Sequence, residues 1–90
     1  MKIKLKLLGN LHLEGKKEME LELPGNVNTI EQLVRYLSES YVLFGFTSID
    51  KIFTNFVFLL NDQDISVLNR EKTKLKENSR LVIIPLIHGG

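Results

Sequence analysis

The last two residues of the chain, Gly89 and Gly90, are suited to chemistry performed by another protein. A terminal glycine has no Cβ beside its carboxylate, so an activating enzyme and an attacking nucleophile can approach the carbonyl carbon without obstruction. Two glycines in succession also adopt backbone conformations that other residues resist, which suits passage through a narrow channel. The free carboxylate is unreactive, but adenylation with ATP would make it an acyl donor to sulfur or to an amine.

No other pattern typical of catalysis, metal binding or phosphate binding occurs in the sequence. His12 and His88 stand in no metal-ligating or catalytic spacing, and there is no glycine-rich phosphate loop. The absence of cysteine excludes a disulfide, a thiolate zinc site and a side-chain persulfide. We therefore expect that the chain is not an enzyme and binds no metal ion or cofactor. Partner proteins would use ATP and supply sulfur.

Length and composition indicate one small globular domain. Ninety residues, 43% of them hydrophobic and 26% charged, are enough for one compact core. The net charge of +1 offers no strong field to a nucleic acid. No apolar stretch approaches the roughly 18 residues of a membrane span, and the N-terminus has no recognisable signal peptide. We expect a cytoplasmic monomer that contacts neither nucleic acid nor membrane.

Two strands are predicted near the N-terminus. Residues 2–7 alternate lysine with Ile or Leu, and residues 17–23 alternate glutamate with Met or Leu. This period of two is typical of strands with one buried face. Because the lysine and glutamate faces are complementary, an antiparallel hairpin is favoured. Gly9, Asn10 and Gly15 suit its connection.

A helix is predicted over about residues 30–41, because Thr29 and Gln32 form a capping-box pattern ahead of apolar residues at helical spacing. Residues 42–54 are expected to form an irregular link with one helical turn. The wholly apolar run 56–60 is typical of a buried central strand.

The remainder predicts a turn at residues 61–64, a short edge strand at 65–68 and a last strand at 80–86, with Leu75 as a buried anchor between them. The whole order predicts an α+β fold, a mixed sheet with one main helix packed across one face. Residues 1–86 would form this domain, and residues 87–90 would leave it as a flexible tail.

The segment 75–90 resembles the C-terminal signature of the β-grasp, ubiquitin-like sulfur carriers. That signature is a leucine, a Gly-Asp turn, an apolar strand, a proline and a terminal diglycine. Asn78-Ser79 stands at the turn, and asparagine retains access to the left-handed conformation. The resemblance covers essentially the whole chain, and the ending His88-Gly89-Gly90 looks more like the ubiquitin-related modifier than like molybdopterin-type carriers. The small archaeal modifier proteins belong to the same family.

The resemblance implies a function. An E1-like enzyme would adenylate Gly90 with ATP, and a sulfurtransferase would convert it to a thiocarboxylate. The sulfur would then serve tRNA thiolation or a cofactor pathway, or the acyl group would be joined to lysines of target proteins. Gly89 would give access to the carboxylate, and Pro85, Ile87 and His88 would shape the tail.

Two alternatives remain open. One is the small sulfur-carrying subunit of molybdopterin synthase, which would form a stable complex with a large catalytic subunit. The other is a ubiquitin-like binding module whose tail is never used.

A partner surface is expected on the sheet beside the tail. Two sets of apolar side chains alternate along residues 80–86, and only one set can pack on the helix. The alternation leaves open which set it is, and the resemblance implies that Leu81 and Ile83 are buried. The other set would form an apolar docking face with a side chain from the preceding strand: Val82, Ile84, Leu86 and Phe58. The alternative is that residues 42–54 fold over this face.

Overall fold

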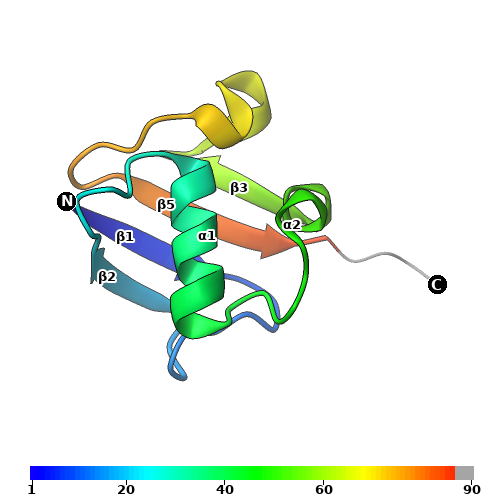
Figure 1. The fold of residues 1–90 in the computed structure, drawn as a ribbon. Helices are drawn as coiled ribbons and strands as arrows, with labels where there is room; N and C mark the ends of the chain where they lie inside the picture. The colour runs from blue at the N-terminus through cyan, green and yellow to red at the C-terminus, as the bar shows by residue number, and fades with distance from the viewer. Residues whose placement is uncertain (87–90) are drawn as a thin grey trace.

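The structure is a computed structural model that describes residues 1–86, and these form a five-stranded sheet crossed by one long helix (Figure 1). Along the chain the elements are β1 (Lys2–Leu7), β2 (Glu18–Glu22), α1 (Ile30–Tyr41), α2 (Ile49–Asn55), β3 (Phe56–Leu60), β4 (Gln63–Asp64), the 3-10 helices η1 (Ile65–Val67) and η2 (Arg70–Lys72), and β5 (Arg80–Pro85). The order across the sheet is β2-β1-β5-β3-β4. Only the β1–β5 pair is parallel. The predicted tail, residues 87–90, lies outside the described residues.

The predicted N-terminal hairpin is confirmed. Lys2, Lys4 and Lys6 lie opposite glutamates of β2, and Lys6 reaches Glu18 at 3.6 Å. Such exposed pairs contribute at most about 1 kcal/mol each. The alternation matters more for register, because a slip by one residue would turn the lysines toward the core and Leu5 and its neighbours toward solvent.

The predicted main helix is confirmed with its bounds. The N–H of Gln32 donates to Thr29 Oγ1 at 3.2 Å, and the N–H of Thr29 donates to Gln32 Oε1 at 3.1 Å. Both arms of the capping box are therefore present, and they satisfy N–H groups that the first turn leaves free. One face of the helix is completely buried against the sheet: Ile30, Leu33, Val34 and Leu37.

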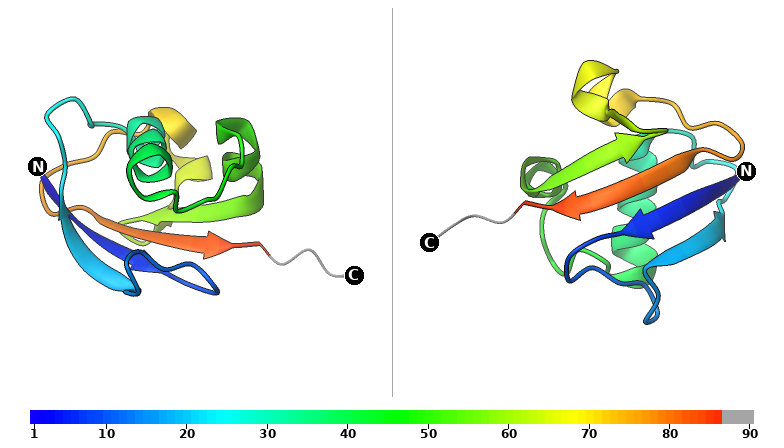
Figure 2. Two further views of the ribbon diagram at one scale, coloured as in Figure 1. Left: turned by 60° about the horizontal axis from the view of Figure 1, so that its bottom comes forward. Right: turned by 180° about the vertical axis from the view of Figure 1, so that it is seen from behind.

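The link after α1 is more regular than predicted. It contains the seven-residue helix α2, whose Ile52 is completely buried. Before it, the ring of Phe44 packs on that of Phe56 with centroids 5.1 Å apart. A helix this short shows too few apolar positions for its period to be recognised in the sequence. Both α helices lie on the same side of the sheet (Figure 2), so the link does not cover the opposite side.

Two strand predictions need correction. β3 is not central, because only the two-residue β4 separates it from the edge, and just Phe58 and Leu60 of its residues are buried. The predicted edge strand 65–68 begins instead with the 3-10 helix η1. Asp64 favours that turn, because its carboxylate accepts a hydrogen bond from the N–H of Ser66 at 2.9 Å.

The turn before β5 has the predicted left-handed residue. Asn78 has φ of 64°, and its N–H donates to the carbonyl of Lys2 at 2.7 Å. Ser79 is buried, and its hydroxyl accepts the N–H of Lys76 at 2.9 Å. Leu75 is buried as predicted. The start of β5 is thereby fixed beside the start of β1.

Val42 offers a test of local backbone strain. This residue ends α1 with φ 52° and ψ 35°, although its side chain is β-branched and 53% exposed. The left-handed conformation costs a residue with a side chain about 1–2 kcal/mol. Glycine avoids this cost, but it loses more conformational entropy on folding, which offsets part of the gain. We predict that Val42→Gly raises the free energy of unfolding by about 0.5–1 kcal/mol, measured by urea denaturation.

Val67 is the matched control, since it is 73% exposed and does not have a positive φ. Val67→Gly should leave the free energy of unfolding unchanged or lower it. An equal gain at both positions would show that Val42 is not strained.

Candidate functional site

The side of the sheet that faces away from α1 and α2 carries the candidate site (Figure 2). Its character changes across the sheet. β1 and β2 present the lysines and glutamates of the hairpin, whereas β5 and β3 present apolar side chains. The molecule therefore has one half-apolar face that neither helix covers.

Four half-buried side chains form the apolar part of this face. Val57 lies opposite Ile84, and Leu59 lies opposite Val82, in adjacent antiparallel strands. Residues that face each other across such a pair share a side of the sheet, so the four make one compact block. We call this block, Val57, Leu59, Val82 and Ile84, the open-face patch.

The structure agrees with the face assignment that the resemblance implied for β5. Leu81 is 1% exposed and Ile83 is 0% exposed, and both belong to the core beneath the helices. Val82 and Ile84 are half-buried on the opposite side. Leu86 follows two residues after Ile84 and is 44% exposed at the end of the described chain.

Phe58 was wrongly placed on the docking face. Its side chain is 1% exposed, and its ring packs against that of Phe53 with centroids 5.2 Å apart. Phe58 pairs with Ile83, so both point toward the helices. The prediction also omitted Val57 and Leu59, which are the residues of β3 that lie on the open face. Five apolar residues in succession carry no polar marker of which side faces the core, and only the register with β5 supplies it.

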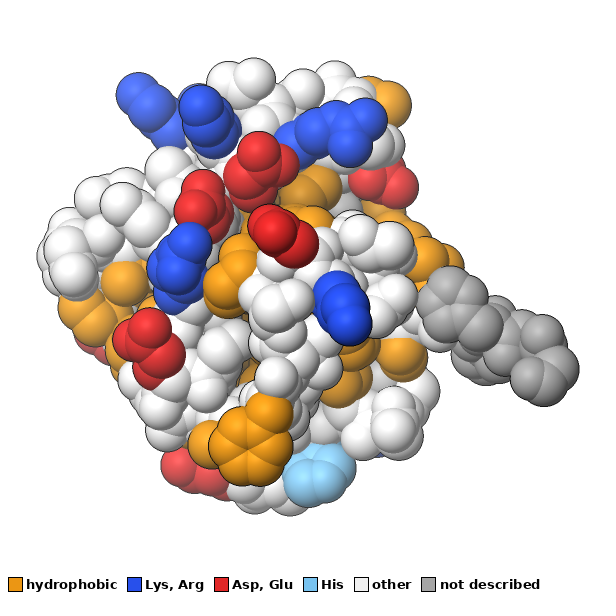
Figure 3. Space-filling model, turned by 45° about the vertical axis from the view of Figure 1, so that its right-hand side comes forward, with side chains coloured by type: hydrophobic (Ala, Val, Ile, Leu, Met, Phe, Trp, Pro, Cys, Tyr) orange, Lys and Arg blue, Asp and Glu red, His pale blue; other side chains and the backbone are white. Residues whose placement is uncertain are grey.

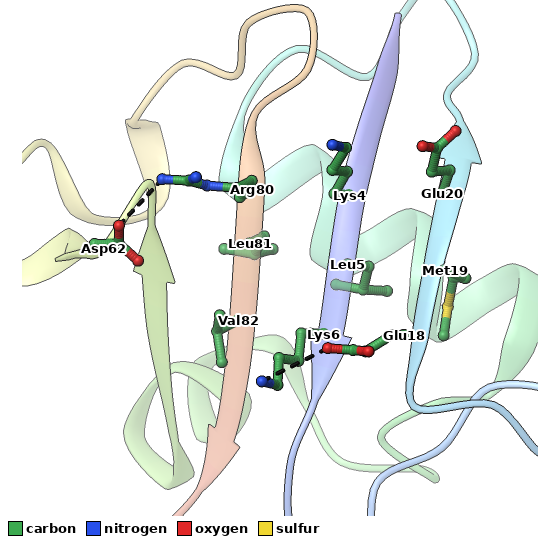
Figure 4. A pocket seen from close by; sticks show the side chains of 10 residues that line it. All are labelled: Lys4, Leu5, Lys6, Glu18, Met19, Glu20, Asp62, Arg80, Leu81 and Val82. Carbon is green, nitrogen blue, oxygen red and sulfur yellow. Dashed lines mark hydrogen bonds and ion pairs between the residues drawn. The ribbon is translucent and has the colours of Figure 1, made fainter.

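A charged border adjoins the open-face patch. It lines a shallow hollow of about 560 Å³ over β2, β1 and β5 (Figure 4). Lys6 lies beside Val82 in the sheet and pairs with Glu18, while Arg80 pairs with Asp62 at 3.1 Å. Three basic side chains, Lys4, Lys6 and Arg80, and three acidic ones, Glu18, Glu20 and Asp62, line the hollow, so it has no strong charge of one sign. A balanced polar border around an apolar centre is typical of a protein–protein interface.

The root of the tail is the end of β5. Pro85 is the last residue of the strand and is half-buried, and the N–H of Leu86 donates to the carbonyl of Asn55 at 2.9 Å. The predicted tail-shaping residues Ile87 and His88, and the predicted reactive Gly89 and Gly90, lie outside the described residues.

Figure 3 shows how the charged and apolar side chains are distributed on the helix side of the molecule. Within residues 1–86, His, Asp and Glu side chains form no group of three or more that could hold a metal ion. No helix in that part of the chain has the length and hydropathy to cross a membrane. The described part of the candidate site consists of the open-face patch, its charged border and the anchored end of β5.

The arrangement defines an α+β, ubiquitin-like protein of the β-grasp fold, as predicted. The Rurm1-related protein of Plasmodium yoelii superposes with a TM-score of 0.76 and 20% identity over 96% of this chain and 98% of that one. A chain from the BexX/CysO complex of Amycolatopsis orientalis gives a TM-score of 0.72 and 18% identity, covering 98% of this chain and 99% of that one.

Sequence comparison narrows the class. The family model described as Urm1 (Ubiquitin related modifier) matches residues 2–90. Ubiquitin-related modifier 1 of Schizosaccharomyces pombe is 29% identical over 102 residues, covering 100% of both chains. The chain belongs to the ubiquitin-related modifier family, and the predicted resemblance to ubiquitin-like sulfur carriers is confirmed.

Two adjacent isoleucines test the assignment of the two faces. Ile83→Ala should lower the free energy of unfolding by about 2–4 kcal/mol, because it leaves a cavity in the core. Ile84→Ala should cost about 1 kcal/mol or less, because that side chain is only half-buried on the open face. Urea denaturation of both variants measures the difference. Equal losses would mean that Ile84 is part of the core.

Proposed function

We propose that the chain carries activated sulfur on its C-terminal glycine, which an E1-like enzyme first adenylates. The observation that supports this most directly is the open-face patch beside the root of a diglycine tail, in a member of the ubiquitin-related modifier family. A half-exposed apolar block next to an unhindered carboxylate suits a protein that docks on a larger enzyme and presents its end to it.

The chemistry proceeds on the partner. A carboxylate oxygen of Gly90 attacks the α-phosphorus of ATP, and pyrophosphate leaves. A persulfide sulfur of a sulfurtransferase then attacks the acyl carbon, and AMP leaves. A thiol cleaves the resulting acyl disulfide, which releases the thiocarboxylate and leaves a disulfide on the partner. The chain has no cysteine, so the carried sulfur resides on its C-terminus alone.

The activated C-terminus, as a thiocarboxylate or an acyl adenylate, can react in two ways. Sulfur can be delivered to tRNA for thiolation in the cytoplasm. Alternatively, a lysine amine of a target protein can attack the acyl carbon and form an isopeptide, and AMP leaves from the adenylate or hydrosulfide from the thiocarboxylate. In both, Gly89 leaves room around the reacting carbonyl, and Pro85, Ile87 and His88 shape the approach. The chain itself binds no cofactor and performs no catalysis in this scheme.

The complex of Amycolatopsis orientalis supports the docking step by analogy, because a chain of the same fold is there part of an assembly with BexX. The family match favours the modifier over the small subunit of molybdopterin synthase.

Intact-mass spectrometry tests the proposed chemistry. After incubation with ATP, a sulfur donor and the E1-like activating enzyme of the same cell, the wild-type chain should show one oxygen replaced by sulfur. The variant that lacks Gly89 and Gly90 should show no change, and neither should the wild type without ATP. Lysine-linked conjugates would appear in the same spectra. An unchanged wild-type mass with an enzyme proven active would exclude the function.

A charge in the open-face patch should prevent docking. Val82→Glu buries a carboxylate at the centre of the interface, so we predict a loss of affinity for the activating enzyme of at least about tenfold, or 1.4 kcal/mol. Titration calorimetry measures it, and circular dichroism checks the fold. Val67→Glu, at a side chain that is 73% exposed outside the patch, is the matched control. Equal affinities of the two variants would place the docking surface elsewhere.

A further inference from the structure

The loop after β1 touches the root of the tail through a glycine. Gly9 has φ of +64°, and a Cβ built on it would lie 2.6 Å from Pro85 Cγ and 3.3 Å from Pro85 Cδ. Side chains do not approach each other so closely. The backbone of the loop therefore packs directly on the proline ring at the end of β5, and no other residue fits at position 9 without a shift.

The proline side of this contact has little freedom. The ring of Pro85 is closed onto its own backbone nitrogen, so a change of ring pucker shifts Cγ only slightly, and any larger displacement of the ring moves the main chain. The next residue is also held, because the N–H of Leu86 donates to the carbonyl of Asn55 at 2.9 Å. A push on the ring is thus transmitted to the chain that leads into the tail.

The loop side is held as well. The Nζ of Lys17 donates to the carbonyl oxygens of Gly9 and Leu11, the latter at 2.8 Å. The N–H of Leu8 donates to the carbonyl of Ile83 at 3.1 Å, which ties the loop to β5. The loop therefore forms a fixed support for the proline ring.

The contact lies between the docking surface and the reactive end. Ile84 belongs to the open-face patch, Pro85 touches Gly9, and the tail follows Leu86. A largely apolar hollow of about 470 Å³ is lined by the loop on one side and the end of β5 on the other: Gly9, Asn10, Ile84, Pro85 and Leu86. A partner seated on the patch would receive the tail in the direction that this contact sets.

We propose that Gly9 is a positioning residue for the terminal acyl group. Its contact with Pro85 fixes the direction in which the chain leaves β5, and so aims Gly90 at the active site of the docked activating enzyme. This inference rests on the proposed function. Reacting groups must meet in a narrow geometry, and a displacement of about 1 Å can lower a rate about a hundredfold.

Gly9→Ala tests the inference against Gly45→Ala. Gly45 has the same φ of +64°, but a Cβ there meets nothing within 4 Å, so the control carries the backbone strain without the contact. We expect Gly9→Ala to slow ATP–pyrophosphate exchange by the E1-like enzyme at saturating carrier at least about tenfold. The Kd of Gly9→Ala for the E1-like enzyme, measured without ATP, should stay within about twofold of the wild-type value, because the open-face patch is intact. Gly45→Ala should change neither quantity by more than about twofold.

A double-mutant cycle isolates the contact. Pro85→Ala removes Cγ and Cδ, so adding Gly9→Ala in that background should have no further effect on the exchange rate. Lys17→Met frees the loop without adding atoms at Gly9, so it should lower the exchange rate by about threefold at unchanged Kd. This variant replaces Gly9→Ala as the test if Gly9→Ala does not fold.

The outcomes separate this inference from the function it rests on. Equal exchange rates of Gly9→Ala and Gly45→Ala would overturn the positioning role. A loss of affinity in Gly9→Ala that matches its loss of exchange rate would overturn it as well. An unchanged rate in Lys17→Met would overturn it if Gly9→Ala were unfolded. A wild-type chain that supports no exchange would instead exclude the proposed function, and the positioning role with it.

Discussion

The parallel pairing of β1 with β5 is the contact on which the rest of the molecule depends. It joins the first strand to the last, in the register Leu5 with Leu81 and Leu7 with Ile83. Parallel neighbours cannot be linked by a tight turn, so the intervening chain must cross the sheet, which it does through α1. The pairing places β5 in the interior of the sheet, with β1 on one side and β3 on the other.

The same strand contributes to the core and to the open-face patch because its side chains alternate. Leu81 and Ile83 contribute to the core, and Val82 and Ile84 belong to the open-face patch. In the free protein part of the patch stays in water. Each Å² of apolar surface that stays there forgoes about 25 cal/mol of hydrophobic stabilisation. In the proposed function, a docking partner recovers that free energy without any rearrangement of the core. Substitutions on the core side of β5 should then affect folding, and those on the open face should affect association.

The root of the tail is held from two directions. The carbonyl of Asn55 at the end of α2 binds the N–H of Leu86, and Gly9 supports the ring of Pro85. In the proposed function, a fixed end of β5 would raise the effective concentration of the terminal carboxylate at a docked active site. In that function the partner supplies the chemistry, and the domain supplies the geometry.

The amino-acid sequence by itself determined the local features: the hairpin, the capping box and bounds of α1, the left-handed turn at Asn78 and the diglycine ending. Each is encoded by neighbouring residues through alternation, spacing or a conformational preference. Tertiary structure alone decided that Phe58 is buried, that Val57 and Leu59 are half-exposed and that α2 lies on the same side of the sheet as α1. A uniformly apolar strand carries no polar side chain to mark its solvent side, and a seven-residue helix shows too little period, so both depended on pairing with distant segments. The contact of Gly9 with Pro85 likewise arises only when the sheet brings the two ends of the domain together.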